Sequence, residues 1–185
     1  MLLTRKQYTE LYFPLAKKVT KGTGIFPETL LAIDIVEGQG KVNGVYYPAQ
    51  SVLVRKANNH FGIKKYPKWN GKTIKVNTPN DAQKISEFVV YNNTEDSYKG
   101  FVNFLKINPR YQSAGVFNAE SYPDQIIKIA RAGYAENPNY ANTIVSVANK
   151  INEVAKNIVT AKEPILKMLA AITVIGVLIN KIQND

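Results

Sequence analysis

Hydrophobic residues recur at helical spacing in the first part of this chain. From Thr4 to Lys18 they predict an amphipathic helix, with Thr4 as its cap. The next segment, Pro27 to Glu37, is apolar on almost every side, which predicts a helix buried all round. Pro27 suits the first turn of a helix, and Gly38 provides a stop.

The rest of the chain adds more helices and two hairpins. Helical spacing is found at 97–106, at 122–133 and from 137 onward, with a shorter helical turn at 51–57. Asn43-Gly44 between apolar residues is typical of a tight hairpin turn. Residues 72–91 alternate around a turn-rich centre and predict a second small hairpin. The fold class expected is therefore α+β, mostly α.

Glu37 is the residue whose position suits acid–base chemistry. It ends an apolar helix, where the helix dipole opposes its charge and apolar neighbours desolvate it. Both effects raise the pKa of a carboxyl. A carboxyl that stays protonated near neutral pH is what a general acid for glycosidic cleavage requires. The alternative is that Glu37 only marks a solvated helix end.

Composition narrows the function classes. The 185 residues include no cysteine, which excludes thiolate chemistry, and one histidine, which makes a His-based zinc site or a Ser-His-Asp triad unexpected. We therefore predict no metal and no cofactor. The net charge of +10 suits a polyanionic partner such as a bacterial cell wall or an anionic membrane. No basic run or zinc-finger spacing supports a nucleic-acid partner.

Six short motifs, taken together, resemble the bacterial glucosaminidase family, glycoside hydrolase family 73. The resemblance covers about residues 8–155. The motifs in chain order are Thr23-Gly24-Ile25-Phe26-Pro27 with Glu37-Gly38-Gln39-Gly40-Lys41, Asn58-Asn59-His60-Phe61-Gly62-Ile63-Lys64, Trp69-Asn70-Gly71, Phe88-Val89-Val90-Tyr91, Asn108-Pro109-Arg110-Tyr111, and Ala132-Gly133-Tyr134-Ala135 with Pro138 and Tyr140. One such motif is weak, but their order and spacing make the set specific.

The resemblance implies a fold and an activity. The fold would be lysozyme-like, with a helical lobe and a small β-lobe on either side of a glycan cleft. The activity would be hydrolysis of the β-1,4 bond after N-acetylglucosamine in peptidoglycan, with Glu37 as the catalytic acid. Cell-wall lysis or remodelling is the expected purpose.

The chain also departs from the family pattern. The family often has a second Glu in the β-hairpin, but we expect none there, and Asp81 is the nearest candidate for a second catalytic carboxylate. Residues 43–50 form an insertion. Asp34 stands where the family has a small apolar residue, and His60 replaces a Leu. A structural hydrogen bond is the favoured role for Asp34, and His60 is expected on the rim of the cleft.

Several other side chains are candidates for the site. Tyr134, at a helix stop, would orient water or an N-acetyl group and is counted with the catalytic residues. The candidate substrate-binding residues are Asn58, Asn59, Phe61, Trp69, Tyr111 and Tyr140. Each also has a purely structural interpretation: the Asn residues would cap a turn, and the aromatic residues would pack in the core.

The C-terminal tail lies beyond the resemblance. We expect a catalytic domain at 1–160 and a hydrophobic tail at 161–185. Its uncharged part, Met168 to Ile179, is shorter than the roughly 20 residues of a spanning helix. Contact of Ile165–Asn180 with a membrane, self-association and packing on the domain are three open interpretations.

Other functions remain open at this stage. One keeps the fold and changes the bond, giving a muramidase or lytic transglycosylase that acts with a single Glu. Another is a non-catalytic wall-binding or assembly protein. The N-terminus is too polar to be a signal peptide, so we expect action at the cell wall or periplasm, or in a phage virion as a lysin, with an unknown export route.

Overall fold

The computed structural model describes residues 2–78 and 81–158. Helix α1 (Arg5–Thr20) begins at Thr4, whose hydroxyl accepts a hydrogen bond from the Gln7 backbone while the Gln7 side chain accepts one from the Thr4 backbone. This reciprocal cap satisfies two of the backbone donors that a helix start leaves free. The expected tail at 161–185 lies outside the described residues.

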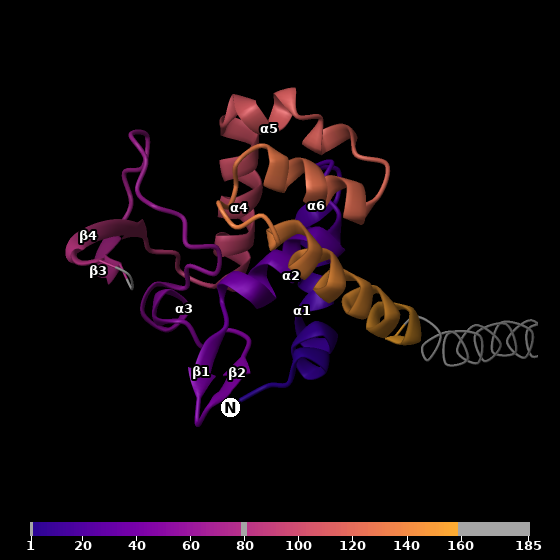
Figure 1. Cartoon of the computed structure of the whole chain (residues 1–185), viewed down its shortest axis with the longest axis horizontal. Coiled ribbons are helices and arrows are strands. Elements are labelled where there is room, and N and C mark those ends of the chain that lie inside the picture. Colours follow the sequence, from indigo (N-terminus) through magenta and orange to yellow (C-terminus); the bar gives the residue numbers. More distant parts are fainter. Residues whose placement is uncertain (1, 79–80, 159–185) are drawn as a thin grey trace, which may run out of the picture.

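Helix α2 (Pro27–Glu37) is the centre of the molecule. Seven consecutive residues, from Thr29 to Ile35, are buried, so the helix is enclosed as its apolar sequence predicts. Helix α1 packs along it, and Figure 1 shows the other helices placed around this pair.

The remaining helices complete the helical lobe. They are α3 (Val52–Ala57), α4 (Thr94–Ile107), α5 (Pro109–Ser113), the 3₁₀ turn η1 (Val116–Asn118), α6 (Tyr122–Arg131) and a last helix at 140–158. Helix α4 begins at Thr94, three residues before the predicted start at 97, because the Asn93 side chain caps it by accepting a hydrogen bond from the Asp96 backbone at 2.8 Å.

Two antiparallel hairpins leave the helical lobe. The first joins β1 (Gly40–Val42) to β2 (Val45–Tyr47) around Asn43-Gly44, as predicted. The second joins β3 (Thr73–Thr78) to β4 (Asp81–Val89), which confirms the hairpin expected at 72–91. Figure 1 shows the β3–β4 hairpin standing to one side of the helices and β1–β2 projecting separately.

The β3–β4 hairpin is tied to the helical lobe by a third segment. The Lys65 backbone donates to the Glu87 carbonyl at 2.9 Å, and the Val89 backbone donates to the Ile63 carbonyl at 3.1 Å. A single bridge between Lys64 and Phe88 adds to this pairing. The segment at 61–66 is therefore held between the hairpin and the helices.

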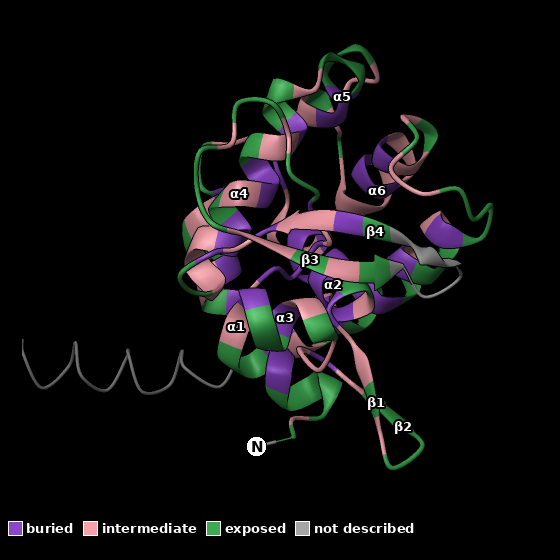
Figure 2. Ribbon diagram, turned by 90° about the vertical axis from the view of Figure 1, so that its left-hand side faces the viewer, coloured by how far each residue is buried: buried purple, intermediate pink, exposed green. Residues whose placement is uncertain are grey.

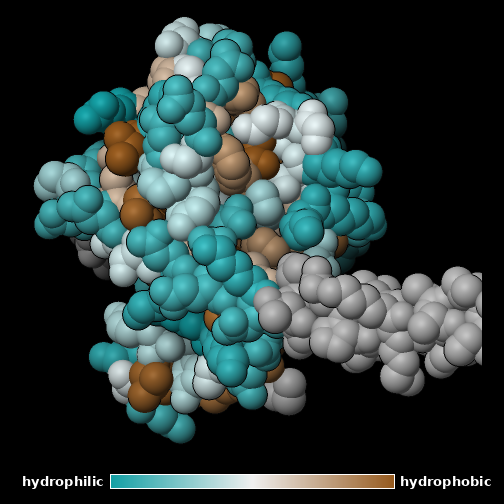
Figure 3. All heavy atoms as spheres, turned by 90° about the vertical axis from the view of Figure 1, so that its right-hand side faces the viewer, coloured by the Kyte–Doolittle hydropathy of each residue, from teal (hydrophilic) through white to brown (hydrophobic). Residues whose placement is uncertain are grey.

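The core lies where α1, α2, α4, α6 and the last helix meet. Figure 2 shows buried residues facing this interior and exposed residues on the outer faces and hairpin tips. The side of the molecule that carries the last helix is mainly hydrophilic, with scattered hydrophobic residues (Figure 3). None of the helices within the described residues is long and apolar enough to cross a membrane.

Candidate active site

A pocket of about 570 Å³ opens at the C-terminal end of α2. Its walls come from the 61–66 segment, α4, α5 and the turn after α6. The lining residues are Glu37, Phe61, Gly62, Ile63, Lys64, Lys65, Tyr66, Phe104, Arg110, Tyr134 and Ala135. Among these described lining residues, Glu37 is the one carboxylate, so acid chemistry in this pocket depends on it.

Glu37 is the last residue of α2, and it lines the pocket at the end of that helix. The Gly38 backbone donates to the Asp34 carbonyl at 2.7 Å, which closes the last turn. A Cβ at position 38 would stand 2.8 Å from that carbonyl oxygen, so a larger residue would disturb the turn that places Glu37. The stop predicted at Gly38 therefore has a packing reason.

The environment of Glu37 raises the pKa of its carboxyl. The residue is exposed toward the pocket, yet the surrounding protein desolvates the charged form, and this is the main cause of the rise. An interaction with the Tyr140 hydroxyl acts in the opposite direction and lowers it. The desolvation expected from the apolar sequence of α2 is thus present in the structure.

Two tyrosines stand beside Glu37. The rings of Tyr134 and Tyr140 lie 5.7 Å apart, and burial raises the pKa of both hydroxyls, with the Glu37 charge as a further cause. The Tyr134 hydroxyl donates to the Phe61 carbonyl at 3.4 Å. The buried Tyr140 oxygen satisfies no hydrogen-bond geometry with any described residue. It is therefore available to the Glu37 carboxyl or to a bound group.

A buried polar network lies one helical turn before Glu37. The Asp34 carboxylate accepts hydrogen bonds from the hydroxyls of Tyr8 at 2.8 Å and Tyr98 at 2.5 Å. Its other oxygen lies 2.7 Å from His60 Nδ1. Asp34 is fully buried and His60 is 2% exposed. The structural role favoured for Asp34 is confirmed, whereas the expectation that His60 is a rim residue was wrong.

The chain was compared with known proteins. Residues 13–153 match the family described as Glucosaminidase, mannosyl-glycoprotein endo-beta-N-acetylglucosaminidase. The chain belongs to this family. Its class is therefore glycoside hydrolase, as the sequence motifs predicted.

Relatives in the glucosaminidase family include two proteins named peptidoglycan hydrolase FlgJ. The one from Vibrio parahaemolyticus is 33% identical over 144 residues, which is 75% of this chain and 44% of the relative. The one from Pseudomonas aeruginosa is 26% identical over 162 residues, 82% of this chain and 38% of the relative. The chain thus spans less than half the length of these relatives.

Solved structures of glycoside hydrolases share the fold. The glycoside hydrolase domain of Salmonella typhimurium FlgJ has a TM-score of 0.66 at 22% identity, covering 89% of this chain and 99% of that one. A peptidoglycan hydrolase from Sphingomonas sp. A1 has a TM-score of 0.65 at 21% identity, covering 82% and 94%. The predicted lysozyme-like α+β fold is confirmed.

The two adjacent asparagines of the glucosaminidase motif serve the backbone. The Asn59 amide donates to the carbonyls of Ile63 and Val89, both at 2.9 Å, and its oxygen accepts from the Ile63 backbone at 3.0 Å. Asn59 is 1% exposed, so the direct sugar contact suggested for it does not fit this geometry. Asn58 has a left-handed backbone, and its amide donates to the Tyr91 carbonyl at 3.1 Å. Both residues shape the loop that supplies Phe61.

The aromatic candidates divide between the pocket and the core. Phe61 lines the pocket but is 4% exposed, so almost none of its surface is open to a sugar. Tyr111 is fully buried, which contradicts an open sugar-binding role. Trp69 lies in a separate hollow of about 320 Å³ beside Tyr91, and its ring nitrogen donates to the Lys72 carbonyl at 3.1 Å. Of these three, only Phe61 reaches Glu37's pocket.

The β3–β4 hairpin carries two carboxylates, the candidate Asp81 and Glu87. Asp81 begins β4 and pairs with Thr78 at the far end of the hairpin, and its side chain lies outside the described part of the chain. The expectation of no Glu in the hairpin was wrong, because β4 contains Glu87. Its carboxylate accepts from Thr73 at 2.6 Å and pairs with Lys65 at 3.4 Å; the Thr73 hydrogen bond is the main reason its pKa is lowered. Position 87 falls within the hairpin predicted at 72–91, so the sequence itself contains this carboxylate.

Proposed function

We propose that this chain hydrolyses peptidoglycan at the β-1,4 bond after N-acetylglucosamine, with Glu37 as the general acid. The observation that carries the proposal is the raised pKa of Glu37 in a pocket of about 570 Å³, within a glucosaminidase-family chain. The name peptidoglycan hydrolase, shared by relatives at 33% and 26% identity, supports peptidoglycan as the substrate. The bacterial cell wall is then where the chain acts.

The first chemical step requires a protonated acid. Glu37 donates its proton to the glycosidic oxygen as the bond to the anomeric carbon breaks, and it becomes a carboxylate. Desolvation keeps the proton on Glu37 at a pH where an ordinary glutamate has lost it. The nearby Tyr140 hydroxyl then stabilises the carboxylate that forms, since its interaction favours the charged state.

In this proposal the second catalytic group is the N-acetyl group of the substrate itself. Glu37 is the one carboxylate among the described lining residues, so the N-acetyl oxygen of the cleaved sugar attacks the anomeric carbon as the leaving group departs. Water then attacks the anomeric carbon and opens the ring that the N-acetyl oxygen had closed, and one proton of this water passes to the Glu37 carboxylate. Tyr134, whose oxygen lies at the Phe61 carbonyl in the pocket wall, is placed to orient the N-acetyl group or the water.

The test of the acid is Glu37→Gln, assayed on purified peptidoglycan with mass spectrometry of the products. Loss of a general acid predicts a fall in rate of about 10²–10⁴-fold. The matched control is Glu28→Gln, which changes a glutamate in the first turn of the same helix and should keep activity near wild type. A Glu37→Gln enzyme within tenfold of wild type would refute the assignment.

Asp81→Asn tests the alternative second group. If Asp81 is a base or nucleophile, this variant loses activity as severely as Glu37→Gln. Near-normal cleavage by Asp81→Asn supports participation of the substrate's N-acetyl group. In that case a substrate lacking the N-acetyl carbonyl should be cleaved poorly by the wild-type enzyme.

The single pocket carboxylate also favours one other activity, that of a lytic transglycosylase. Mass spectrometry of the same peptidoglycan digest distinguishes these two activities. Hydrolysis after N-acetylglucosamine leaves that sugar at the new reducing end, whereas a transglycosylase leaves a 1,6-anhydro muramic acid end and a muramidase a reducing muramic acid. Binding without any product would instead indicate a wall-binding protein.

A further inference from the structure

Three cationic side chains line the Glu37 pocket. Lys64 and Lys65 come from the segment held against β4, and Arg110 comes from α5. They face a single carboxylate among the described lining residues, so this part of the surface is strongly positive. The proposed acid step at Glu37 does not use these cations, and the hydroxyls of a sugar chain do not require a charged partner.

Arg110 is held in a fixed position at the pocket edge. Its Nη2 donates to the Tyr111 hydroxyl at 2.7 Å, and its guanidinium lies over the Tyr111 ring at 4.8 Å from the centroid. Its Nη1 passes 3.5 Å from where a Cβ would stand at Gly133. Within the described chain no carboxylate pairs with Arg110. The remaining N–H donors of this fork can therefore take an external carboxylate.

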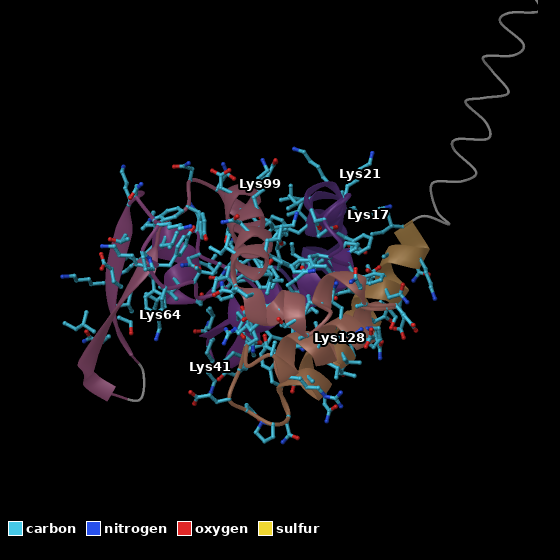
Figure 4. All side chains as sticks on the ribbon, turned by 90° about the horizontal axis from the view of Figure 1, so that it is seen from above. Lys17, Lys21, Lys41, Lys64, Lys99 and Lys128 are labelled. Atoms are coloured by element: carbon cyan, nitrogen blue, oxygen red, sulfur yellow. The ribbon has the colours of Figure 1, made fainter. Side chains whose placement is uncertain are left out.

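The two lysines differ in their partners. Lys65 pairs with Glu87 at 3.4 Å, so part of its charge is already compensated. Lys64 is exposed, and none of the ion pairs found in the described residues involves it. Figure 4 shows Lys64 on the side of the β3–β4 hairpin, whereas Lys21 lies across the molecule near the end of α1.

We propose that Arg110 and Lys64 make this enzyme select glycan strands whose peptide stems carry free carboxylates, by binding those carboxylates next to the cleaved bond. The inference rests on the proposed function, because it names which form of peptidoglycan the Glu37 pocket prefers. Peptide stems carry free carboxylates, whereas stems whose carboxylates have been converted to amides carry none. Charge-assisted hydrogen bonds to a preorganised Arg favour the first form over the second.

The experiment compares kcat/KM on two soluble substrates made from one preparation: glycan strands with free stem carboxylates, and the same strands after carbodiimide coupling to methylamine has converted those carboxylates to neutral amides. The wild-type enzyme should cleave the strands with free carboxylates roughly tenfold better, the effect of about two good ionic contacts. The Arg110→Gln/Lys64→Gln variant should lose most of this ratio, and Arg110→Lys should keep more of it than Arg110→Gln. Added salt should reduce the wild-type ratio.

Lys21→Gln is the matched control, since it removes an exposed positive charge far from the pocket and should leave the ratio unchanged. Equal wild-type cleavage of both substrates would overturn the inference while leaving the proposed function standing. An equal loss on both substrates in Arg110→Gln, with a lowered melting temperature, would show that Arg110 only supports Tyr111 and would also overturn it. Failure of the wild-type enzyme to cleave either substrate refutes the proposed function, and this inference with it.

Discussion

Asp34→Ala is expected to be one of the most destabilising single substitutions in this chain. Asp34 is the common acceptor for Tyr8, Tyr98 and His60, at 2.8, 2.5 and 2.7 Å. Removing its carboxylate leaves three buried polar groups without their partner. Asp34 is 0% and His60 2% exposed, so bulk solvent does not reach these groups.

The magnitude follows from burial. Removing one partner of a buried pair costs about 3–5 kcal/mol, and each buried group left unsatisfied costs about 1–3 kcal/mol, with strong overlap between the two figures. We therefore expect about 4 kcal/mol for Asp34→Ala. Asp34→Asn keeps the shape and one acceptor oxygen, and should cost less, about 1–3 kcal/mol. A measurable loss in Asp34→Asn, which keeps the volume of the side chain, separates a hydrogen-bonding role from simple filling of space.

Urea unfolding followed by circular dichroism measures the effect. With a slope of about 2 kcal/mol per molar, a loss of about 4 kcal/mol lowers the midpoint by about 2 M. Glu10→Ala is the control, because Glu10 makes only an exposed contact with Lys6 at 3.9 Å and should leave the midpoint unchanged. An Asp34→Ala midpoint within about 0.5 M of wild type, or one no lower than that of Asp34→Asn, would refute the reasoning.

Three further predictions concern Glu37 and the tail. Desolvation raises the folded pKa of Glu37 above its ordinary 4.5. The stability contributed by the protonated carboxyl is therefore complete at low pH and is lost as the pH rises through the raised pKa. Because Glu37→Gln cannot ionise, this variant should melt at a higher temperature than wild type at pH 7, with no difference near pH 3. Tyr140→Phe removes the contact that lowers that pKa, so the basic limb of the pH–rate profile should move to higher pH, and an unmoved or lowered limb would contradict this. Deleting Ile165–Asp185 should leave cleavage of soluble wall fragments intact while changing membrane partitioning or oligomer size, measured by vesicle flotation and light scattering; a folded, monodisperse truncation that no longer cleaves would place the tail in the catalytic domain.

Local patterns were enough to predict most elements of the fold, although not the short helix α5 or the turn η1. The apolar run of α2, the Thr4 cap and the Asn43-Gly44 turn each depend on neighbours within a few residues, and each appears where the sequence placed it. Long-range partners could not be predicted in this way. His60 looked like a rim residue because nothing near it in sequence accepts its proton, and its partner Asp34 is 26 residues away. Glu87 lies inside the predicted hairpin, but its partners Thr73 and Lys65 are 14 and 22 residues away in the sequence.

The same reasoning explains how much of the site the sequence could indicate. Glu37 was found because helix end, apolar neighbours and motif all lie within one segment. For Asn59 the sequence leaves a sugar contact and a turn cap both open, because an amide suits either a hydroxyl or a backbone partner. The choice was decided by Ile63 and Val89, whose carbonyls converge on it only after the hairpin folds against the loop. Residues whose role depends on two elements meeting are the ones that sequence patterns assign least well.

Helix α2 carries two carboxyl groups one turn apart, and the neighbours of each decide its role. Asp34 faces inward, where Tyr8, Tyr98 and His60 supply three hydrogen bonds that compensate a buried charge. Glu37 faces the pocket, where burial disfavours its charged form and Tyr140 opposes that effect only in part. The first arrangement fixes the helix against its surroundings, and the second leaves a proton available at its end. Under the role proposed for Glu37, the network around Asp34 therefore supports catalysis without touching substrate, because it holds in place the turn from which Glu37 projects.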